Sequence, residues 1–255
     1  MRINSSVILI SPRLYLVPYN THHVEKYHTW MACPSLQAAT SSEPLTLDEE
    51  YEAQKQWSEL DDRLTFILLD RDRLDHRMGG TPESWKSSEV DAMIGDINLF
   101  LIPRIEDPEG TKEPLYEGEL SVMLAEERTR GQGLAPEALA TFLEYIGRNL
   151  PYKLCSLVAK VSMDNEPSIR LFRGRLGFVE RNRCNVFKQI EFIPPPECYD
   201  PETDYSSAHG GKFRNIASST AQWIVQQMAT KRFEFQPSHW SYEEADLNLW
   251  RGSLS

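Results

Sequence analysis

One stretch, residues 119–136, constrains the fold of this chain more than any other. Its composition predicts an apolar strand, then a loop of Arg and Gly, then a helix with apolar residues along one side. Gly131 and Gly133 allow a tight turn and leave amide N–H groups bare, and Pro136 suits the first helical turn. Bare amides at a helix N-terminus favour anions. The pattern therefore predicts a cradle for a diphosphate.

The sequence motif in this loop limits which class of phosphate-containing ligand is expected. The loop lacks the third Gly of a dinucleotide-binding fingerprint and the Gly-Lys-Ser/Thr of a P-loop. Arg130-x-x-Gly133-x-Ala135 instead resembles the acetyl-CoA motif of the GNAT acetyltransferase superfamily. The alternative is a pair of glycines that only makes a turn.

A second stretch, residues 165–178, supports the resemblance. Asn165 is a good N-cap, Pro167 suits a first turn and Gly177 suits the position after a helix. The stretch is therefore a well-capped helix. Asn-x-x-Ser followed by Leu-Gly-Phe also resembles the second GNAT motif, particularly in the RimJ/RimL branch.

The resemblance implies an α/β (α+β) GNAT fold. Its sheet is mixed and mostly antiparallel, with helices on both faces, and it splays between the fourth and fifth strands, here 116–125 and 154–161. The pantetheine of acetyl-CoA is expected in that splay, paired with backbone groups of Met123 and Ala125. The full set of implied acetyl-CoA contacts is Met123, Leu124, Ala125, Arg128, Arg130, Gly131, Gln132, Gly133, Leu134, Ala135, Asn165, Ser168 and Phe172.

Apolar periodicity predicts the remaining elements. Further strands are expected at 14–18, 64–70, 92–101, 178–181 and 185–193, and helices at 22–31 and about 46–60. Residues 71–91 are predicted to be a long hairpin loop. The three prolines 194–196 predict a boundary between a GNAT domain, 1–193, and a C-terminal extension, 194–255. A helix within 218–232 is expected to dock on the domain or on a partner.

Composition limits the partners and the compartment. A net charge of −11 argues against nucleic acid and anionic membranes as partners. The 4 cysteines have no Cys-x-x-Cys spacing, which favours reduced thiols in the cytoplasm, with the nucleus as the alternative. His22, His23 and His28 lack the spacing of a metal site, so no metal is expected. No segment is long enough to cross a bilayer.

Other stretches resemble the N-acetyltransferase 9-like family more closely. They are Leu16–Tyr19, Ser42–Leu47, Gly95–Phe100 and Gly118–Leu120, and the resemblance covers roughly residues 1–193. It implies acetylation of protein amino groups, because members are described as acetyltransferases of α- and β-tubulin.

The chemistry needs a neutral amine that attacks the thioester. Glu119 is the candidate base, with Glu117 as the alternative because residues two apart share a strand face. Asn165 is expected to hold the pantetheine arm or a water, besides capping its helix. Phe172 stands where many GNAT enzymes carry a Tyr general acid, which puts that acid in doubt.

The sequence therefore predicts an acetyl-CoA-dependent N-acetyltransferase that acts on a protein or peptide amine, with tubulin as a candidate. The alternatives are a non-catalytic acetyl-CoA-binding or cytoskeletal interaction protein and a small-molecule amine acetyltransferase.

Overall fold

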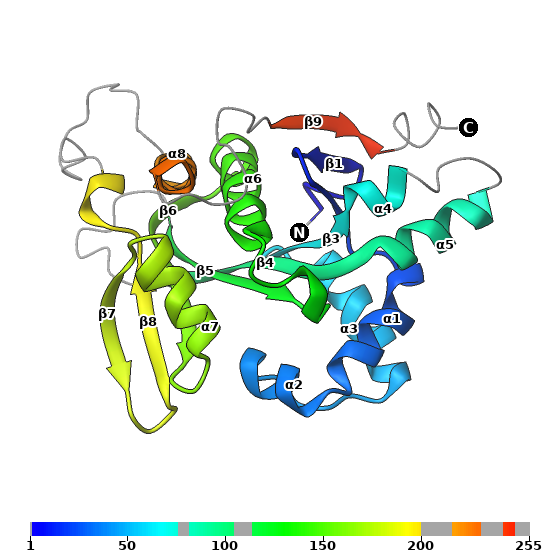
Figure 1. Ribbon diagram of the computed structural model, residues 1–255, viewed down its shortest axis with the longest axis horizontal. Helices are drawn as coiled ribbons and strands as arrows, with labels where there is room; N and C mark the ends of the chain where they lie inside the picture. The colour runs from blue at the N-terminus through cyan, green and yellow to red at the C-terminus, as the bar shows by residue number, and fades with distance from the viewer. Residues whose placement is uncertain (1, 76–81, 105–113, 200–215, 231–241, 248–255) are drawn as a thin grey trace.

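One sheet organises the computed structural model, which describes residues 2–75, 82–104, 114–199, 216–230 and 242–247. In these residues the sheet has 9 strands in the order β7-β8-β6-β5-β4-β3-β2-β1-β9 (Figure 1). The strands are β1 Val7–Ile10, β2 Leu14–Pro18, β3 Arg63–Asp70, β4 Met93–Arg104, β5 Leu115–Leu124, β6 Lys153–Ser162, β7 Val179–Cys184, β8 Gln189–Ile193 and β9 Glu243–Asp246. Among the described strands only β5 and β6 pair in parallel, so the predicted mixed, mostly antiparallel sheet is confirmed.

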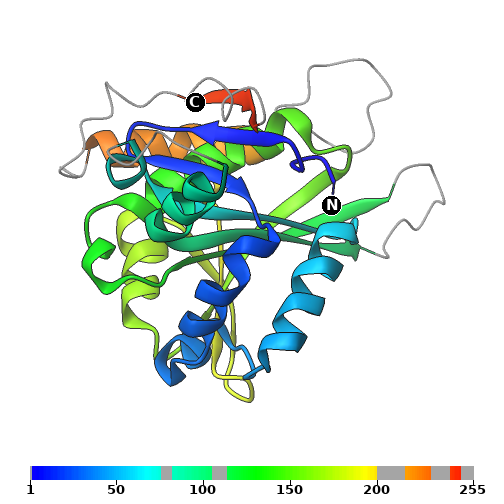
Figure 2. The same cartoon turned by 90° about the vertical axis from the view of Figure 1, so that its right-hand side faces the viewer.

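Helices cover both faces of this sheet, as predicted (Figures 1 and 2). They are α1 Val24–Met31, α2 Pro34–Thr40, α3 Leu47–Glu59, α4 Arg71–Asp75, α5 Pro82–Ala92, α6 Leu134–Asn149, α7 Glu166–Ile169 and α8 Ile216–Thr230, with a π-helical turn at Arg170–Arg175. Short 3-10 turns lie at Thr21–His23, Glu127–Thr129 and Pro196–Cys198. None of the described helices is long and apolar enough to span a bilayer.

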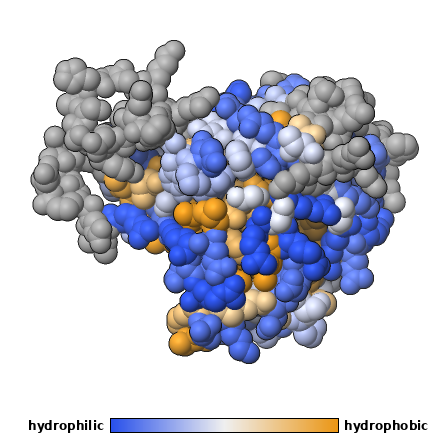
Figure 3. Space-filling model, turned by 60° about the vertical axis from the view of Figure 1, so that its left-hand side comes forward, coloured by the Kyte–Doolittle hydropathy of each residue, from blue (hydrophilic) through white to orange (hydrophobic). Residues whose placement is uncertain are grey.

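Two apolar cores result, one on each face. The face under α6 and α8 buries Phe66, Phe142 and Ile224 in one cluster. The opposite face buries Tyr27 of α1 with Ile67 and Met123 of the sheet in a second cluster. On the face presented in Figure 3, apolar side chains gather near the centre and hydrophilic ones surround them.

The splay between β5 and β6 is also confirmed. Their pairing runs from Leu115↔Lys153 and ends at Glu119↔Val158. Beyond that point β5 continues beside β4, while β6 pairs with β8 from Ala159 onward. β5 and β6 therefore separate beyond Glu119 and Val158. The edge of each strand that faces the gap no longer pairs with the other strand.

Residues 71–91 differ from the prediction, because they hold α4 and most of α5 in place of a long hairpin loop. Pro82 suits the first turn of a helix, and Ser and Lys are tolerated on its exposed side. The polar composition of this segment favoured a loop. The contacts that fix α5 come from tertiary packing, as the fully buried Glu89 shows, and composition does not reveal them. The part of this prediction at 76–81 lies outside the described residues.

The described part of the C-terminal extension packs on the rest of the chain. In α6, a Cβ on Gly147 would lie 2.0 Å from Ser218 Oγ of α8, so the two helices touch at a glycine. Trp223 Nε1 donates to the Leu176 carbonyl at 2.7 Å, and β9 pairs with β1. The boundary at 193/194 stays a prediction. Two tryptophans of the extension that we expected to act as apolar anchors, Trp240 and Trp250, lie outside the described residues.

A candidate active site in the splayed sheet

A cavity of about 780 Å³ includes residues from both strands of the splay. Its lining joins the Gly loop before α6, the edge of β5 and the N-terminus of α7, and it reaches α1, α2 and β4 on the other side. Of the predicted site residues, the lining includes Glu119, Met123, Leu124, Arg130, Gly131, Gly133, Leu134, Ala135, Asn165, Ser168 and Phe172. Tertiary structure thus brings together two motifs that are about thirty residues apart in the sequence.

The loop at Gly131 and Gly133 has the backbone that a cradle needs. Both residues have positive φ, 78° and 79°, a region that glycine enters without strain. Within the described chain, the amides of Gly131, Gln132 and Gly133 donate to no backbone carbonyl. They lie at the N-terminus of the 16-residue α6, where the helix dipole favours a negative charge. These residues fit the diphosphate of acetyl-CoA.

An ion pair between the partly exposed Arg13 and the buried Glu137 fixes this loop, and sequence reasoning missed it. Glu137 of α6 is fully buried and accepts from Ser11 Oγ, the Arg13 amide and Arg13 Nε at 2.7–2.8 Å. The same guanidinium donates to the carbonyls of Gln132 and Gly133 at 2.8 and 3.2 Å. These two hydrogen bonds tie the backbone of the loop to Arg13 and so stabilise its conformation. Arg13 lies about 120 residues away in sequence, so no local pattern indicates this contact.

Three predicted cofactor residues, Ala125, Arg128 and Gln132, are not among the residues that line the cavity. Both backbone groups of Ala125 already have partners, since its N–H donates to Ile94 at 2.9 Å and its carbonyl accepts from Arg130 at 2.9 Å. Arg128 pairs with Glu126 at 3.5 Å, and the Gln132 side chain donates back to the Arg128 carbonyl. The Arg130 guanidinium donates to the carbonyls of Leu124 and Ala125 at the end of β5, so in this conformation it is bonded to the protein backbone.

The second motif forms the other wall. Asn165 Oδ1 accepts from the Ser168 amide at 3.2 Å, which is the predicted N-cap bond. Phe172 lies in the π-helical turn, packs on Phe178 and Phe192 and is 4% exposed. π-turns inside helices are frequent at functional sites. The predicted role of Gly177 is matched by its φ of 71°.

The two predicted carboxylates have different surroundings. Glu119 faces the cavity, where Lys160 Nζ donates to its Oε2 at 2.6 Å. Glu117 is bound by Arg104, Arg181 and Ser156. Burial would raise the pKa of Glu117, but hydrogen bonds from Arg181 and Ser156 and the two positive charges lower the pKa to about 2. A carboxylate so stabilised in its charged form is a poor proton acceptor at neutral pH.

A third carboxylate, Asp96 of β4, lines the same cavity and was not proposed from the sequence. It is 2% exposed, and its Oδ2 accepts from Asn98 Nδ2 at 2.8 Å and from Tyr27 Oη at 3.3 Å. Burial raises its pKa to about 6, against the opposing effect of those two hydrogen bonds. In the sequence, the feature that could have indicated this residue is a single acidic side chain within the mainly apolar stretch Met93–Leu101.

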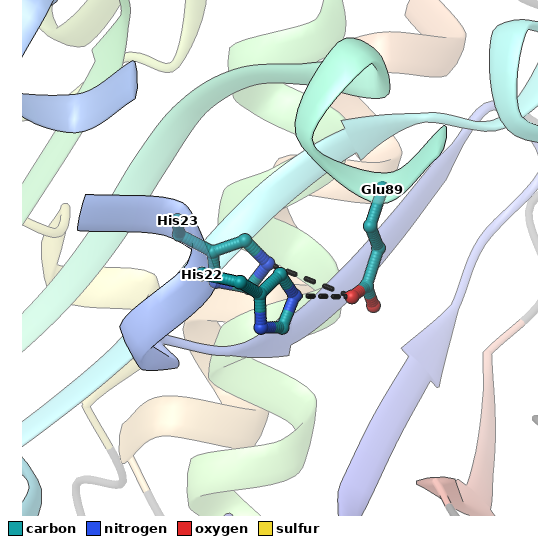
Figure 4. Close-up of side chains that lie close together, drawn as sticks. All are labelled: His22, His23 and Glu89. Atoms are coloured by element: carbon teal, nitrogen blue, oxygen red, sulfur yellow. Dashed lines mark hydrogen bonds and ion pairs between the residues drawn. The ribbon is translucent and has the colours of Figure 1, made fainter. Parts of the chain in front are cut away.

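His22, His23 and Glu89 also meet, away from the cavity (Figure 4). Glu89 Oε2 lies 2.6 Å from His22 Nε2 and 3.7 Å from His23 Nε2. His23 Nδ1 accepts the Asn20 N–H at 3.1 Å, so a neutral His23 carries its proton on Nε2, the atom that faces Glu89. Metal-binding histidines usually have the reverse arrangement, with the second nitrogen as donor. The arrangement is that of a carboxylate held by two histidines, and it fits a metal ion less well. The expected absence of a metal stays a prediction.

Comparisons with known proteins first define the class. A family model described as an acetyltransferase (GNAT) domain matches residues 13–179. Two solved structures share the fold: an uncharacterised protein from Bacillus halodurans (TM-score 0.52, 11% identity, 84% of this chain and 91% of that one) and RimL, a ribosomal L7/L12 alpha-N-protein acetyltransferase (TM-score 0.51, 14% identity, 71% and 89%). The splayed sheet with its Gly loop is that of a GNAT acetyltransferase.

Relatives then narrow the family. The chain is 38% identical to an N-acetyltransferase 9-like protein of Caenorhabditis elegans over 197 residues, 76% of this chain and 89% of that protein. It is 40% identical to the alpha/beta-tubulin-N-acetyltransferase 9 of Homo sapiens over 191 residues, 74% and 84% of the two chains. The chain belongs to the N-acetyltransferase 9-like family of GNAT acetyltransferases. It is an N-acetyltransferase that uses acetyl-CoA as donor.

Proposed function

We propose that this chain transfers the acetyl group of acetyl-CoA to a protein amino group, with the N-terminus of tubulin as a candidate acceptor. The observation that carries the proposal is one cavity with an anion cradle at Gly131–Gly133 and carboxylates at Asp96 and Glu119. A cradle suits the diphosphate of the donor, and carboxylates suit an incoming ammonium. The tubulin candidate rests on relatives from Homo sapiens and Drosophila melanogaster that bear the name alpha/beta-tubulin-N-acetyltransferase 9.

The proposed reaction is a direct attack. The lone pair of the amine forms a C–N bond with the thioester carbonyl carbon, the C–S bond breaks, and CoA leaves as a thiolate. The nitrogen loses a proton in the attack, and Glu119 is its proposed acceptor, once the incoming substrate displaces Lys160 from the carboxylate. Asn165 is proposed to hold the pantetheine arm or a water. Phe172 cannot protonate the leaving group, and a thiolate leaves without that help.

The test measures release of CoA thiol from acetyl-CoA with purified full-length chain. The acceptors are peptides with the N-termini of α- and β-tubulin, the same peptides with a blocked α-amine, and spermidine. We expect turnover with the free peptides and none with the blocked ones, because the peptide amine is the nucleophile. Turnover with spermidine but with no peptide would replace the proposal with a small-molecule activity. Acetyl-CoA binding without turnover on any amine would favour the non-catalytic alternative.

The predicted cytoplasmic location remains part of the proposal. Microscopy of the tagged protein, with a nuclear marker as reference, tests it directly.

A further inference from the structure

Asp96 is the one described acidic side chain of β4 in the cavity, and one of its oxygens has no partner there. Its Oδ2 is held by Asn98 and Tyr27, whereas Oδ1 is buried without any hydrogen bond among the described residues. A buried carboxylate oxygen without a donor is costly, and such groups call for an explanation. A ligand that donates hydrogen bonds in the cavity would supply one.

The register places Asp96 near the expected reaction centre. Asp96 is opposite Met123, Asn98 is opposite Ser121, and Phe100 is opposite Glu119. Residues two apart share a face of a sheet, so Ser121 lies between the positions of Asp96 and Glu119 on the face that the cavity exposes. Diagonal neighbours across an antiparallel pair lie roughly 7–8 Å apart. An amine beside Ser121 would thus have a carboxylate on either side.

The groups that surround Asp96 come from three other elements. Tyr27 of α1 donates a hydrogen bond to Asp96. Tyr19, which precedes the turn at Thr21–His23, lies close enough to interact with the negative charge of Asp96. Glu50 of α3 adds negative charge near both tyrosines. The facing cation is Arg63 of β3, whose guanidinium lies over the rings of Trp57 and Phe100 at 4.2 and 4.4 Å. Burial outweighs the hydrogen bonds from Asn98, Tyr27 and the Asp96 backbone as well as the charge of Arg63, so the pKa of Asp96 is raised to about 6.

We propose that Asp96 binds the acceptor amine as an ammonium through Oδ1 and takes the first proton from that ammonium. This inference rests on the proposed function. An N–H bond of the ammonium breaks, an O–H bond forms on Asp96, and the neutral amine keeps its lone pair for the thioester. The second proton leaves in the attack, toward Glu119 in the proposed reaction. Asp96 returns its proton to solvent after the product leaves.

This assignment favours an α-amine over a lysine side chain. An α-ammonium has a pKa of about 8, so its transfer to a carboxylate of pKa about 6 is about a hundredfold uphill. A lysine ammonium, with a pKa of about 10.4, makes the same step more than ten-thousandfold uphill. A chain N-terminus is therefore the acceptor that this assignment favours over a lysine side chain.

The test compares pH profiles of kcat/KM for Asp96→Asn, Glu119→Gln, Tyr27→Phe and Glu50→Gln in the full chain. The acceptor is whichever amine turns over best, peptide or spermidine, so that failure of the peptide acceptors rejects the proposed function without removing this test. Acetyl-CoA affinity and the thermal midpoint of each variant report on folding. Glu50→Gln is the matched control, because Glu50 is a buried carboxylate with a raised pKa that does not line the cavity.

For the wild-type chain, kcat/KM should rise to a plateau through about pH 6 as Asp96 loses its proton. Asp96→Asn should lose at least tenfold at pH 7 and recover as pH rises toward the amine pKa, with acetyl-CoA affinity unchanged. Tyr27→Phe removes a hydrogen bond that lowers the pKa of Asp96, so its acidic limb should move to higher pH. Glu50→Gln should keep the limb.

Two results would overturn the assignment. One is an Asp96→Asn chain that keeps the wild-type profile. The other is a loss that is equal at every pH, with an unmoved limb in Tyr27→Phe, because a purely structural carboxylate would give that pattern. If Glu119→Gln alone removes the acidic limb, Glu119 performs both proton transfers.

Discussion

At the scale of single residues, Gly133 joins conformation to charge. Its φ of 79° is a value that Asn and Asp also tolerate, so a substitution here tests the ligand more than the fold. Gly133→Asp places a carboxylate where the donor's diphosphate is expected. We expect calorimetry to give at least tenfold weaker acetyl-CoA binding. Gly133→Asn is the control of equal size, and it should bind more tightly than Gly133→Asp. Equal affinities for the two variants would remove the loop from the phosphate site.

At the scale of elements, the contact of α6 with α8 depends on Gly147. Replacing Gly by Ala in a helix normally stabilises it by about 1 kcal/mol. Here the added Cβ would meet Ser218 Oγ at 2.0 Å and the Ser218 amide nitrogen at 3.0 Å. We therefore expect Gly147→Ala to lower the thermal midpoint by several degrees. Adding Ser218→Gly removes the nearer atom and should restore part of the loss. A Gly147→Ala chain that is more stable than the wild type would mean that α8 does not dock there.

At the scale of the whole molecule, the extension separates stability from binding. Ile216, Ala217, Ala221, Ile224 and Met228 of α8 are buried in the same cluster as Phe142 of α6. In the described chain, no residue that lines the cavity comes from α8 or β9. A chain that ends at Ile193 should therefore bind acetyl-CoA with unchanged affinity but unfold at a lower temperature, because it exposes the apolar surface that α8 covers. Loss of acetyl-CoA binding in a folded truncated chain would contradict this division.

Local sequence patterns were sufficient to predict the backbone features of the two motifs. Glycines at 131 and 133 are followed by an apolar helix, and Asn165 and Gly177 bracket another, so the residue pattern alone locates both motifs. The mixed, mostly antiparallel sheet followed from the order of the predicted elements, and the splay followed from a resemblance that the two motifs carry. Each signal lies within about twenty residues, the range over which turns, caps and periodicity act.

Packing between distant elements determined which groups meet. It pairs Arg13 with Glu137, gives Glu119 an ammonium neighbour in Lys160, and binds Glu117 to Arg181. It buries Asp96 beneath Tyr27, which raises a pKa that the sequence alone leaves at its ordinary value. Proton affinity depends on burial and on neighbouring charges, and both are set by contacts between elements far apart in the chain. That is why the fold and the conformation of the Gly131–Gly133 loop were predictable, while the surroundings of the carboxylates were not.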